Sequence, residues 1–343
     1  MENPKSENPM MRVSLLDAAG SVRLAECPIP VPGHGEVLVR VAAVGICGSD
    51  THYFEHGRIG PFIVEEPLVL GHEASGRIVA VGAGVSDHRI GERISIEPQA
   101  PCRRCRQCKS GQYNLCPEMA FFATPPVDGA FAEYVVIGED FAHTVPESIS
   151  DAAAALIEPL SVGIWACQKG EVQAGSRVLV TGAGPIGVIA AQVARAFGAS
   201  EVHITDVSAE RLDVALLHGA THAHHAGDRL EGLDVDVFID AAGAEAAIRS
   251  GISAVRPAGT VVLVGLGSDD VSIPVGLIRN REIKMTGVFR YANTWPLAIR
   301  LLAEDRIDLD SLVTDSFGLE DVEKALLSSR GAGKMKTIVL PGQ

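Results

Sequence analysis

The sequence predicts an α/β protein in which a β-rich N-terminal region is followed by a doubly wound parallel sheet. Short β-branched runs fill the chain up to about Ser150, whereas after Gly175 short apolar runs alternate with helical stretches. The chain has 343 residues, of which 47% are hydrophobic and 21% are charged. This length favours about two domains, each with its own core, and the composition excludes a disordered acidic chain.

Short β-branched runs, separated by glycine, proline and charged residues, fill the chain before Ser150. This pattern is typical of antiparallel strands joined by turns. The expected strands are residues 36–44, 76–81, 92–96 and 133–137. The first ten residues lack the apolar segment of a targeting signal, so we expect a frayed tail and a cytoplasmic protein.

After Gly175 the apolar runs have the length and continuity of buried parallel strands, with helical spacing between most of them. The expected strands are residues 178–181, 201–205, 235–240, 260–265 and 282–286, and the expected helices are residues 186–197, 209–218 and 244–255. Helices of this length make the crossovers of a doubly wound sheet. Helices at 295–303 and 320–329 and a strand at 336–340 follow, and we expect this last stretch to return to the first domain.

Charge and hydropathy argue against two classes of partner. Lysine and arginine number 29 against 43 aspartates and glutamates, which leaves a formal net charge of −14. Such a chain repels a nucleic-acid backbone. The longest uncharged run, residues 178–194, is shorter than the roughly 20 residues of a membrane span and contains glycines and a proline. We therefore expect no nucleic-acid partner and no membrane span.

A glycine loop follows the first expected strand of the second region. Gly182, Gly184 and Gly187 have the G-x-G-x-x-G spacing, which allows a tight turn, close approach of a pyrophosphate and close packing of helix on strand. Asp206 ends the next strand, about 20 residues on, where a carboxylate accepts from ribose hydroxyls and repels a 2′-phosphate. The pattern favours NAD. Arg211 leaves NADP open, and a glycine turn without a ligand is the alternative.

Four of the seven cysteines, Cys102, Cys105, Cys108 and Cys116, form a C-x2-C-x2-C-x7-C array. Four thiolates this close in sequence can close a tetrahedral shell around Zn²⁺, which makes a structural site. An iron–sulfur cluster and buried or redox-active cysteines are the alternatives. The basic residues between them also suggest a nucleic-acid zinc knuckle, but no aromatic stacking surface accompanies them. The clustering favours a reducing compartment over a disulfide frame.

Cys47, His72, Glu73 and Glu158 form a second, dispersed set. One thiolate, one imidazole and one or two carboxylates would leave a metal with an open position for water or substrate. Taken singly, each residue also has a structural explanation, such as a small core side chain, a loop histidine or a helix-capping acid. Their spacing alone does not join them into a site.

Several motifs follow one another along nearly the whole chain: GICGSDTHY, GHEASG, the four-cysteine lobe, IEPLSVG, VTGAGPIG and GVFRYANTWP. In this order they resemble the zinc-dependent medium-chain dehydrogenases, and most closely the polyol dehydrogenases of sorbitol and xylitol type. The resemblance implies a GroES-like catalytic domain of residues 1–160 and 296–343 with a structural zinc lobe at 101–117, an inserted Rossmann domain of residues 161–295, and a homotetramer. Animal sorbitol dehydrogenases commonly lack the full cysteine lobe, so the chain resembles non-animal members.

The resemblance also implies roles for single residues. Cys47, His72 and Glu73 match the catalytic zinc ligands, and Glu158 matches an acid that contacts the zinc-bound water or the metal itself. The positions that match the substrate site are Ser49, Tyr53, Phe121, Glu158, Arg290 and Tyr291. The positions that match the cofactor site are Gly182, Gly184, Pro185, Ile186, Gly187, Asp206, Arg211, Val264, Gly265, Leu266, Val288, Phe289 and Arg290. Ser49 and His52 are candidates for a proton relay, with a surface-loop position as the alternative for His52.

The activity that the resemblance implies is oxidation of a polyol at C2 to the ketose, with NAD and two zinc ions per chain. Zinc coordination can lower a hydroxyl pKa from about 16 toward about 7, so we expect an alkoxide that passes hydride to NAD⁺, while Glu158 takes the proton through water. Whether Glu73 or Glu158 ligates the metal at each step stays open. The alternatives are another alcohol such as galactitol, butanediol or threonine, and an NAD-binding protein without turnover.

Overall fold

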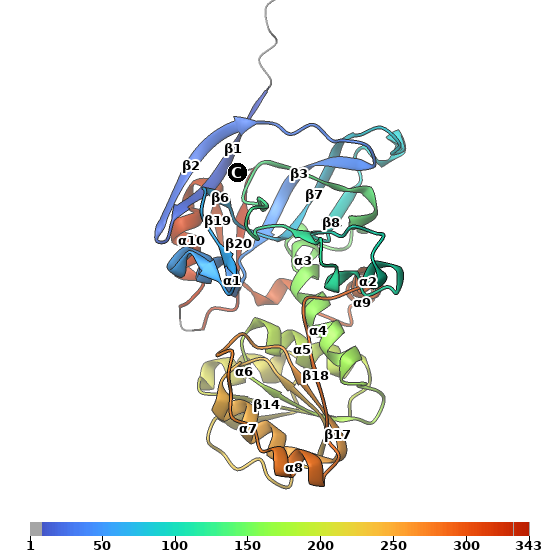
Figure 1. The fold of residues 1–343 in the computed structure, drawn as a ribbon, viewed down its shortest axis with the longest axis vertical. Coiled ribbons are helices and arrows are strands. Elements are labelled where there is room, and N and C mark those ends of the chain that lie inside the picture. The colour runs from blue at the N-terminus through green and yellow to red at the C-terminus, as the bar shows by residue number, and fades with distance from the viewer. Residues whose placement is uncertain (1–8, 332, 343) are drawn as a thin grey trace, which may run out of the picture. The chain divides into compact units, whose positions relative to one another are not determined.

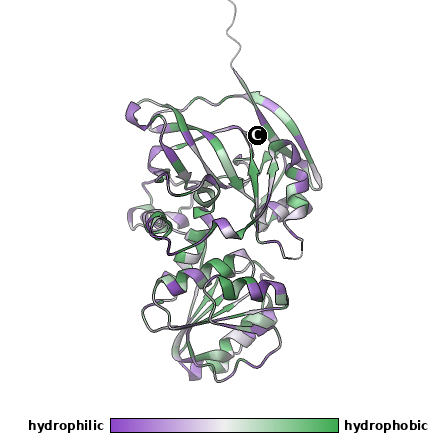
Figure 2. Ribbon diagram, turned by 180° about the vertical axis from the view of Figure 1, so that it is seen from behind, coloured by the Kyte–Doolittle hydropathy of each residue, from purple (hydrophilic) through white to green (hydrophobic). Residues whose placement is uncertain are grey.

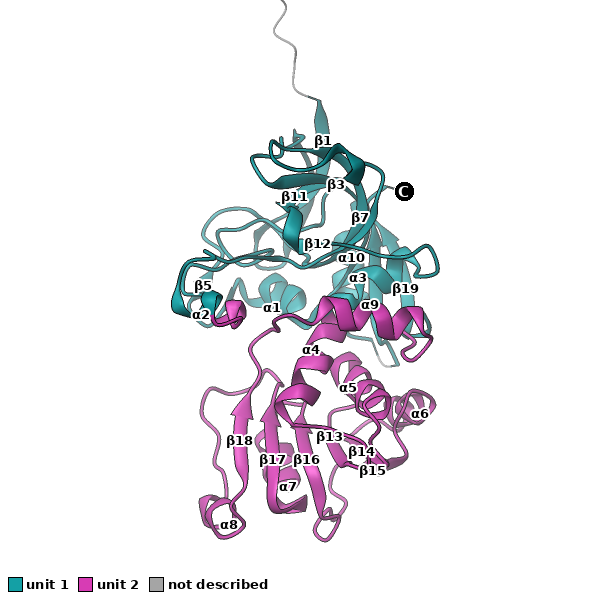
Figure 3. Cartoon of the chain, turned by 90° about the vertical axis from the view of Figure 1, so that its right-hand side faces the viewer, with its two compact units in different colours: residues 1–109, 116–158, 310–343 teal, residues 110–115, 159–309 magenta. Residues whose placement is uncertain are grey.

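The computed structural model describes residues 9–331 and 333–342, which form two compact units (Figure 3). Unit 1 contains the described residues of Met1–Lys109, Cys116–Glu158 and Asp310–Gln343. Unit 2 contains Ser110–Leu115 and Pro159–Leu309, so it interrupts unit 1 in the sequence. Most of the expected N-terminal tail lies outside the described residues.

Unit 1 is built mainly from antiparallel strands (Figure 1). Its largest sheet has the order β12-β8-β7-β3-β20-β19, with β11 also paired to β3. These strands are β3 (Glu36–Gly45), β7 (Glu73–Val81), β8 (Arg93–Ile96), β11 (Tyr134–Gly138), β12 (Ala142–Thr144), β19 (Val313–Gly318) and β20 (Lys336–Leu340). The smaller sheets contain β1 (Met10–Ala18), β2 (Ser21–Pro28), β4 (Arg58–Ile59), β5 (Phe62–Ile63), β6 (Leu68–Val69), β9 (Gln99–Ala100) and β10 (Ala120–Phe121).

The strand β3 lies inside the largest sheet, where it pairs with β7, β11 and β20. Its valine-rich sequence suits the middle of a sheet, and most of its side chains are buried. Near its end, Gly45 pairs with Glu73 of β7 and with Ile338 of β20. The last strand of the chain therefore pairs with a strand of the first unit.

The helices of unit 1 are short. They are α1 (Gly48–His56), α2 (Arg106–Lys109), α3 (Asp151–Ala155) and α10 (Val322–Ser328). Ser150 is the N-cap of α3, because its hydroxyl accepts a hydrogen bond of 2.9 Å from the backbone N–H of Ala153. The next helix, α4 (Ile157–Lys169), starts in unit 1 and continues into unit 2.

Unit 2 has a six-stranded parallel sheet of order β15-β14-β13-β16-β17-β18. In chain order this is 3-2-1-4-5-6, the order of a Rossmann sheet. The strands are β13 (Arg177–Thr181), β14 (Glu201–Asp206), β15 (His222–His225), β16 (Val235–Asp240), β17 (Val255–Leu263) and β18 (Lys284–Gly287). The edge strand β15 was not expected, because HAHH has no apolar run.

Helices pack against this sheet and enclose its core. They are α5 (Pro185–Ala196), α6 (Ala209–Leu217), α7 (Glu245–Ala254) and α8 (Val275–Asn280), and α9 (Trp295–Ala303) follows. One core cluster joins Leu179, Phe238, Ile252 and Val261, which are all fully buried. Figure 2 shows the hydrophobic residues concentrated on the central strands and on α5. Among the described residues, no helix has the length and apolar composition needed to cross a membrane.

Two segments lie in unit 2 rather than within the bounds expected from sequence. Residues 296–309 join it because Gln192 of α5 exchanges hydrogen bonds with the backbone of Asp308. Residues 110–115 join it because Asn114 donates to the carbonyl of Phe289 over 2.8 Å.

Candidate active site and metal centres

Three of the predicted catalytic ligands meet in unit 1. Cys47 directly precedes α1, His72 directly precedes β7, and Glu73 is the first residue of β7. One donor atom from each lies within 4.8 Å of the other two. His72 and Glu73 are 6% and 1% exposed, so the donors are withdrawn from bulk water. A sulfur, a nitrogen and an oxygen donor suit zinc and leave a further coordination position open.

Asp50 orients two of these ligands. Its side chain is fully buried and accepts the backbone N–H of Cys47 over 2.9 Å and that of Gly71 over 3.0 Å. The Nδ1 atom of His72 lies 3.6 Å from the same carboxylate. Nε2 is therefore the nitrogen of His72 left for a metal, which is the usual arrangement of a ligating histidine held by a carboxylate.

The electrostatics of this site favour a cation. Burial disfavours the charged imidazolium of His72, but the charges of Asp50 and Cys47 outweigh it and raise the pKa of His72 well above its ordinary value. A buried group of acidic donors stabilises positive charge, whether a proton or a metal ion. The residues present therefore fit the zinc ion that the family resemblance implies.

Glu73 also takes part in a buried ion pair. The Nζ atom of Lys336 lies 2.7 Å and 2.5 Å from the two carboxylate oxygens of Glu73, and it donates to the carbonyl of Ile46. Burial opposes the charge of Lys336, but the charges of Glu73 and Cys47 raise its pKa above the ordinary value. Gly45 makes room for this pair, because a Cβ atom there would lie 2.1 Å from a Glu73 oxygen.

The other predicted residues of unit 1 differ in how deeply they are buried. Glu158 is 5% exposed at the start of α4, and its charge is among the causes of the raised pKa of Lys336. Phe121 is buried, with its ring centre 5.6 Å from that of His72. On α1, Tyr53 is buried and Ser49 is half-buried, whereas His52 is exposed beside His56. Their substrate and relay roles stay predictions.

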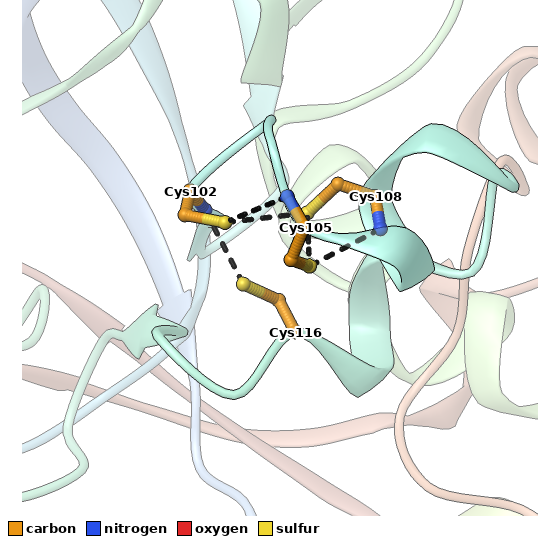
Figure 4. A group of neighbouring side chains, drawn as sticks. All are labelled: Cys102, Cys105, Cys108 and Cys116. Carbon is orange, nitrogen blue, oxygen red and sulfur yellow. Dashed lines mark hydrogen bonds between the residues drawn. The ribbon is translucent and has the colours of Figure 1, made fainter.

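The four-cysteine lobe has the geometry of a closed metal site (Figure 4). The Sγ atom of Cys108 lies 3.4 Å from that of Cys105 and 4.0 Å from that of Cys102. Zn–S bonds of about 2.3 Å in a tetrahedron place sulfurs about 3.8 Å apart, between these two values. Backbone N–H groups of Cys102, Cys105 and Cys108 also point at sulfurs of the group.

The thiols of this lobe differ in acidity. A hydrogen bond from the backbone of Arg104 is the main cause that lowers the pKa of Cys102 to about 6. Partial burial and then the neighbouring thiol of Cys105 raise the pKa of Cys108 to about 12. Four thiolates cannot ionise side by side without a compensating cation, so the donor set fits a divalent metal.

In unit 2 the glycine loop has the backbone that the motif predicts. Gly182 has φ +89°, a value that glycine adopts freely, and it connects β13 to the loop. Gly184 is the N-cap of α5, and Pro185 is its first residue. A Cβ atom on Gly187 would lie 1.7 Å from the carbonyl oxygen of Gly182, so only glycine allows this turn. A turn of this kind at a helix N-terminus suits a pyrophosphate.

Asp206 sits at the end of β14, beside this loop. Its Oδ2 atom accepts the backbone N–H of Ala183 over 2.7 Å, and Oδ1 accepts that of Ser208 over 2.9 Å. Each oxygen keeps a second lone pair for a ligand hydroxyl. A cavity of about 660 Å³, at the carboxyl ends of the strands, includes Gly182 and Asp206 in its lining. Arg211 lies in the first turn of α6.

The remaining predicted residues follow β17 and β18. Val264, Gly265 and Leu266 come directly after β17, and the first two donate their backbone N–H groups to the carbonyl of Asp240. After β18, Val288 precedes the half-exposed Phe289, and the Arg290 guanidinium lies 4.8 Å from the ring centre of Phe289. Tyr291 is fully buried against Trp295, so its ring belongs to the core of unit 2. The substrate roles of Arg290 and Tyr291 stay predictions.

Comparison with known proteins places the chain in a family. Residues 33–147 match the family Alcohol dehydrogenase GroES-like domain, and residues 185–304 match the family Zinc-binding dehydrogenase. The chain is 43% identical over 326 residues to the sorbitol dehydrogenase of Bacillus subtilis strain 168, with 92% of each protein covered. The chain therefore belongs to the zinc-dependent medium-chain dehydrogenases. Within them it belongs to the polyol dehydrogenase group.

Solved structures of relatives have the same fold and hold either nicotinamide cofactor. An Escherichia coli CFT073 protein, described as a short chain alcohol dehydrogenase in complex with NADH, aligns with a TM-score of 0.91 at 30% identity, covering 97% of this chain and 99% of that one. A zinc-binding dehydrogenase from Sinorhizobium meliloti 1021, bound to NADP, aligns with a TM-score of 0.90 at 31% identity, covering 97% and 100%. The choice between the two cofactors therefore depends on local residues.

Sequence reasoning missed Asp50 and Lys336. Asp50 stands three residues after Cys47, in the same GICGSD motif, so a search for acids near a ligand cysteine would have found it. Lys336 had no such signal, because 263 residues separate it from Glu73. Only the pairing of β3 with both β7 and β20 brings the two together.

Asp50→Asn should loosen the catalytic metal. The amide cannot hold the histidine and two backbone N–H groups in the same way, so we expect zinc affinity at this site to fall about 10- to 100-fold. Competition with a chelator, read out as zinc retained per chain, measures the change. Asp87→Asn, at an exposed carboxylate of unit 1, is the matched control. Equal zinc retention by both variants would contradict the orienting role.

Cys105→Ser should remove the structural metal. One ligand of a closed tetrahedral site is lost, so we expect about one zinc fewer per chain and a lower thermal midpoint. Elemental analysis after gel filtration and a thermal melt measure both effects. Cys27→Ser, at a half-buried cysteine outside the lobe, should leave the zinc content unchanged. A Cys105→Ser protein with full zinc content would show that the lobe does not hold the metal.

Proposed function

We propose that the protein oxidises a polyol of the sorbitol or xylitol type at C2 to the ketose, with NAD⁺ as the hydride acceptor. The observation that carries this proposal is the donor set of half-buried Cys47 with buried His72 and Glu73, which Asp50 orients. The long similarity to an enzyme named sorbitol dehydrogenase supports the substrate class. A neutral polyol is also compatible with a chain of net charge −14.

The residues of unit 1 divide the chemistry among them. Zinc, when bound, acts as a Lewis acid that makes a substrate hydroxyl easier to deprotonate, and NAD⁺ takes the hydride. Cys47 and His72 hold the metal, and Asp50 fixes their orientation. Lys336 neutralises part of the charge of Glu73, so two carboxylates can lie near one centre. Glu158 accepts the hydroxyl proton at a carboxylate oxygen through an intervening water.

Asp206 is the basis for preferring NAD⁺. Its two oxygens accept the backbone N–H groups of Ala183 and Ser208, and its side chain, which lines the cavity, keeps lone pairs for ribose hydroxyls. A 2′-phosphate would bring negative charge against this carboxylate. Arg211 is the residue that would favour NADP⁺ if its side chain turned toward that phosphate.

We also propose that Arg290 binds vicinal hydroxyls of the substrate, and that the enzyme acts in the cytoplasm as a homotetramer. The guanidinium offers several donors for a polyol. A reducing compartment suits the cysteines, all of which are free in the described part of the chain. The tetramer follows from the family resemblance, and its mass in solution tests it.

A substrate panel with metal analysis tests the proposed activity. At the two sites of unit 1 we expect two zinc ions per chain, and we expect a higher kcat/KM with sorbitol and xylitol than with galactitol, 2,3-butanediol or threonine, measured as NAD⁺ reduction. If another alcohol gives the highest kcat/KM, the proposed hydride transfer stands and the proposed substrate is wrong. Cofactor binding with no turnover and no metal at Cys47 would favour a non-catalytic NAD-binding protein.

Glu158→Gln should lower turnover. A carboxamide cannot take the proton, so we expect kcat to fall about 100-fold or more. Zinc content is measured in the same samples, because a loss of metal would give the same effect for another reason. Glu147→Gln, whose side chain is 85% exposed, is the control. Unchanged kcat in the zinc-containing variant would rule out the proton role.

Asp206→Asn should weaken NAD⁺ binding. The loss of one charged acceptor corresponds to roughly 10- to 100-fold in KM for NAD⁺, and the ratio of kcat/KM for NADP⁺ over NAD⁺ should rise as repulsion disappears. Initial rates with both cofactors measure this. Asp213→Asn, at an exposed position of α6, should behave as the wild type. A wild-type preference for NADP⁺ would overturn the assignment.

A further inference from the structure

A group of histidines lies at one edge of the unit 2 sheet, on the edge strand β15 and its neighbour β14. Glu201 and His203 alternate with apolar residues along β14, and His222 and His224 are two apart on β15. The register pairs His203 with His222. Because side chains two apart share a face and paired residues share a face, all four side chains lie on one face of the sheet.

Three of these side chains are close enough to bind one ion. A donor atom from each of Glu201, His203 and His222 lies within 4.8 Å of the other two. The rings of His203 and His222 are stacked, with centres 4.5 Å apart, and Nε2 of His203 lies 3.1 Å from a Glu201 oxygen. His203 is 4% exposed, whereas His222 is exposed, so the group is anchored inside and reachable from solvent.

A fourth side chain, that of His224, contacts His203 of this group. The Nδ1 atom of His203 lies 3.0 Å from Nε2 of His224. With its proton on Nδ1, His203 donates to His224 and presents the Nε2 lone pair to a metal. A second hydrogen-bonded group of this kind fixes the ring and tautomer of a ligating histidine.

We propose that Glu201, His203 and His222 form a third metal site of this protein, for a divalent first-row transition ion such as Zn²⁺. Two imidazole nitrogens and one carboxylate oxygen suit Zn²⁺, Ni²⁺ or Cu²⁺ better than Mg²⁺ or Ca²⁺, which prefer oxygen ligands. Water completes the coordination shell. This site is separate from the cysteine-containing centres of unit 1 and does not depend on the proposed dehydrogenase activity.

The competing explanation is a metal-free hydrogen-bond network. Arg177 of β13 donates to Oε2 of Glu201 over 3.0 Å, the oxygen that also faces His203. This ion pair neutralises the carboxylate without a metal. It engages one oxygen, however, and Oε1 can serve as the ligand while Oε2 stays with Arg177. Nδ1 of the exposed His222 ring lies 2.8 Å from the hydroxyl of Thr221, so Nε2 is the nitrogen left for a metal.

A bound ion would have a structural consequence. The edge strand β15 is four residues long and continues into residues 225–231, which belong to the lining of the cavity beside Asp206. The ion would link β15 to β14 through side chains as well as through the backbone. Binding to the folded chain alone then stabilises it by mass action.

The test counts metal beyond the two zincs of unit 1. Tag-free protein holding those two ions is dialysed against buffered Zn²⁺, and bound zinc is measured. We expect a third equivalent in the wild type, with a rise in thermal midpoint. His222→Ala and Glu201→Gln should each weaken this third equivalent at least about tenfold and abolish the rise. Both positions are solvent-accessible, and circular dichroism confirms that the variants fold.

His225→Ala is the matched control, because His225 is exposed on the same strand with its side chain on the opposite face. It should retain the third equivalent. If His225→Ala weakens binding as much as His222→Ala, or if Glu201→Gln has no effect, the binding is loose chelation by the histidine tract and the proposal fails. A wild type that binds only two zinc ions also overturns it.

Discussion

The pairing of β3 with both β7 and β20 is the interaction on which the site of unit 1 depends. It places Gly45 between Glu73 and Ile338, and so brings a ligand from the early chain beside a lysine from its end. β3 then leads through Ile46 to Cys47, the thiol of the same centre. One strand thus positions the thiolate, the carboxylate and the balancing ammonium.

Electrostatics explains why these groups occur together. Burying an ion away from water costs several kcal/mol unless it is paired, and this centre buries Asp50, Glu73 and Glu158 close to a thiol. Lys336 compensates part of that charge, and the raised pKa of His72 shows that the place still favours positive charge. A divalent ion bound there would supply what remains, and such an ion is a Lewis acid. The four-cysteine lobe follows the same rule with thiolates alone.

The sequence predicted the features that have local signals. Strong apolar runs and the glycine spacing located most strands of unit 2, and the cysteine spacing located the lobe. The edge strand β15 was not predicted because histidines give no apolar period. Residues 296–309 belong to unit 2 because Gln192 of α5 contacts Asp308, 116 residues further along the chain, and no local signal shows such a contact. The joining of Cys47, His72 and Glu73 came from resemblance, since residues 25 positions apart meet only through the fold. Neither a local sequence signal nor the family resemblance predicted the role of Lys336.

The central claim is that the buried donors of unit 1 hold a zinc ion oriented by Asp50. Diffraction at the zinc absorption edge, from crystals of active enzyme grown without added metal, tests it most directly. The account predicts an anomalous peak about 2.0–2.3 Å from Cys47 Sγ and His72 Nε2, in addition to the peak within the four cysteines. Crystals of active enzyme with a peak only in the cysteine lobe would contradict it.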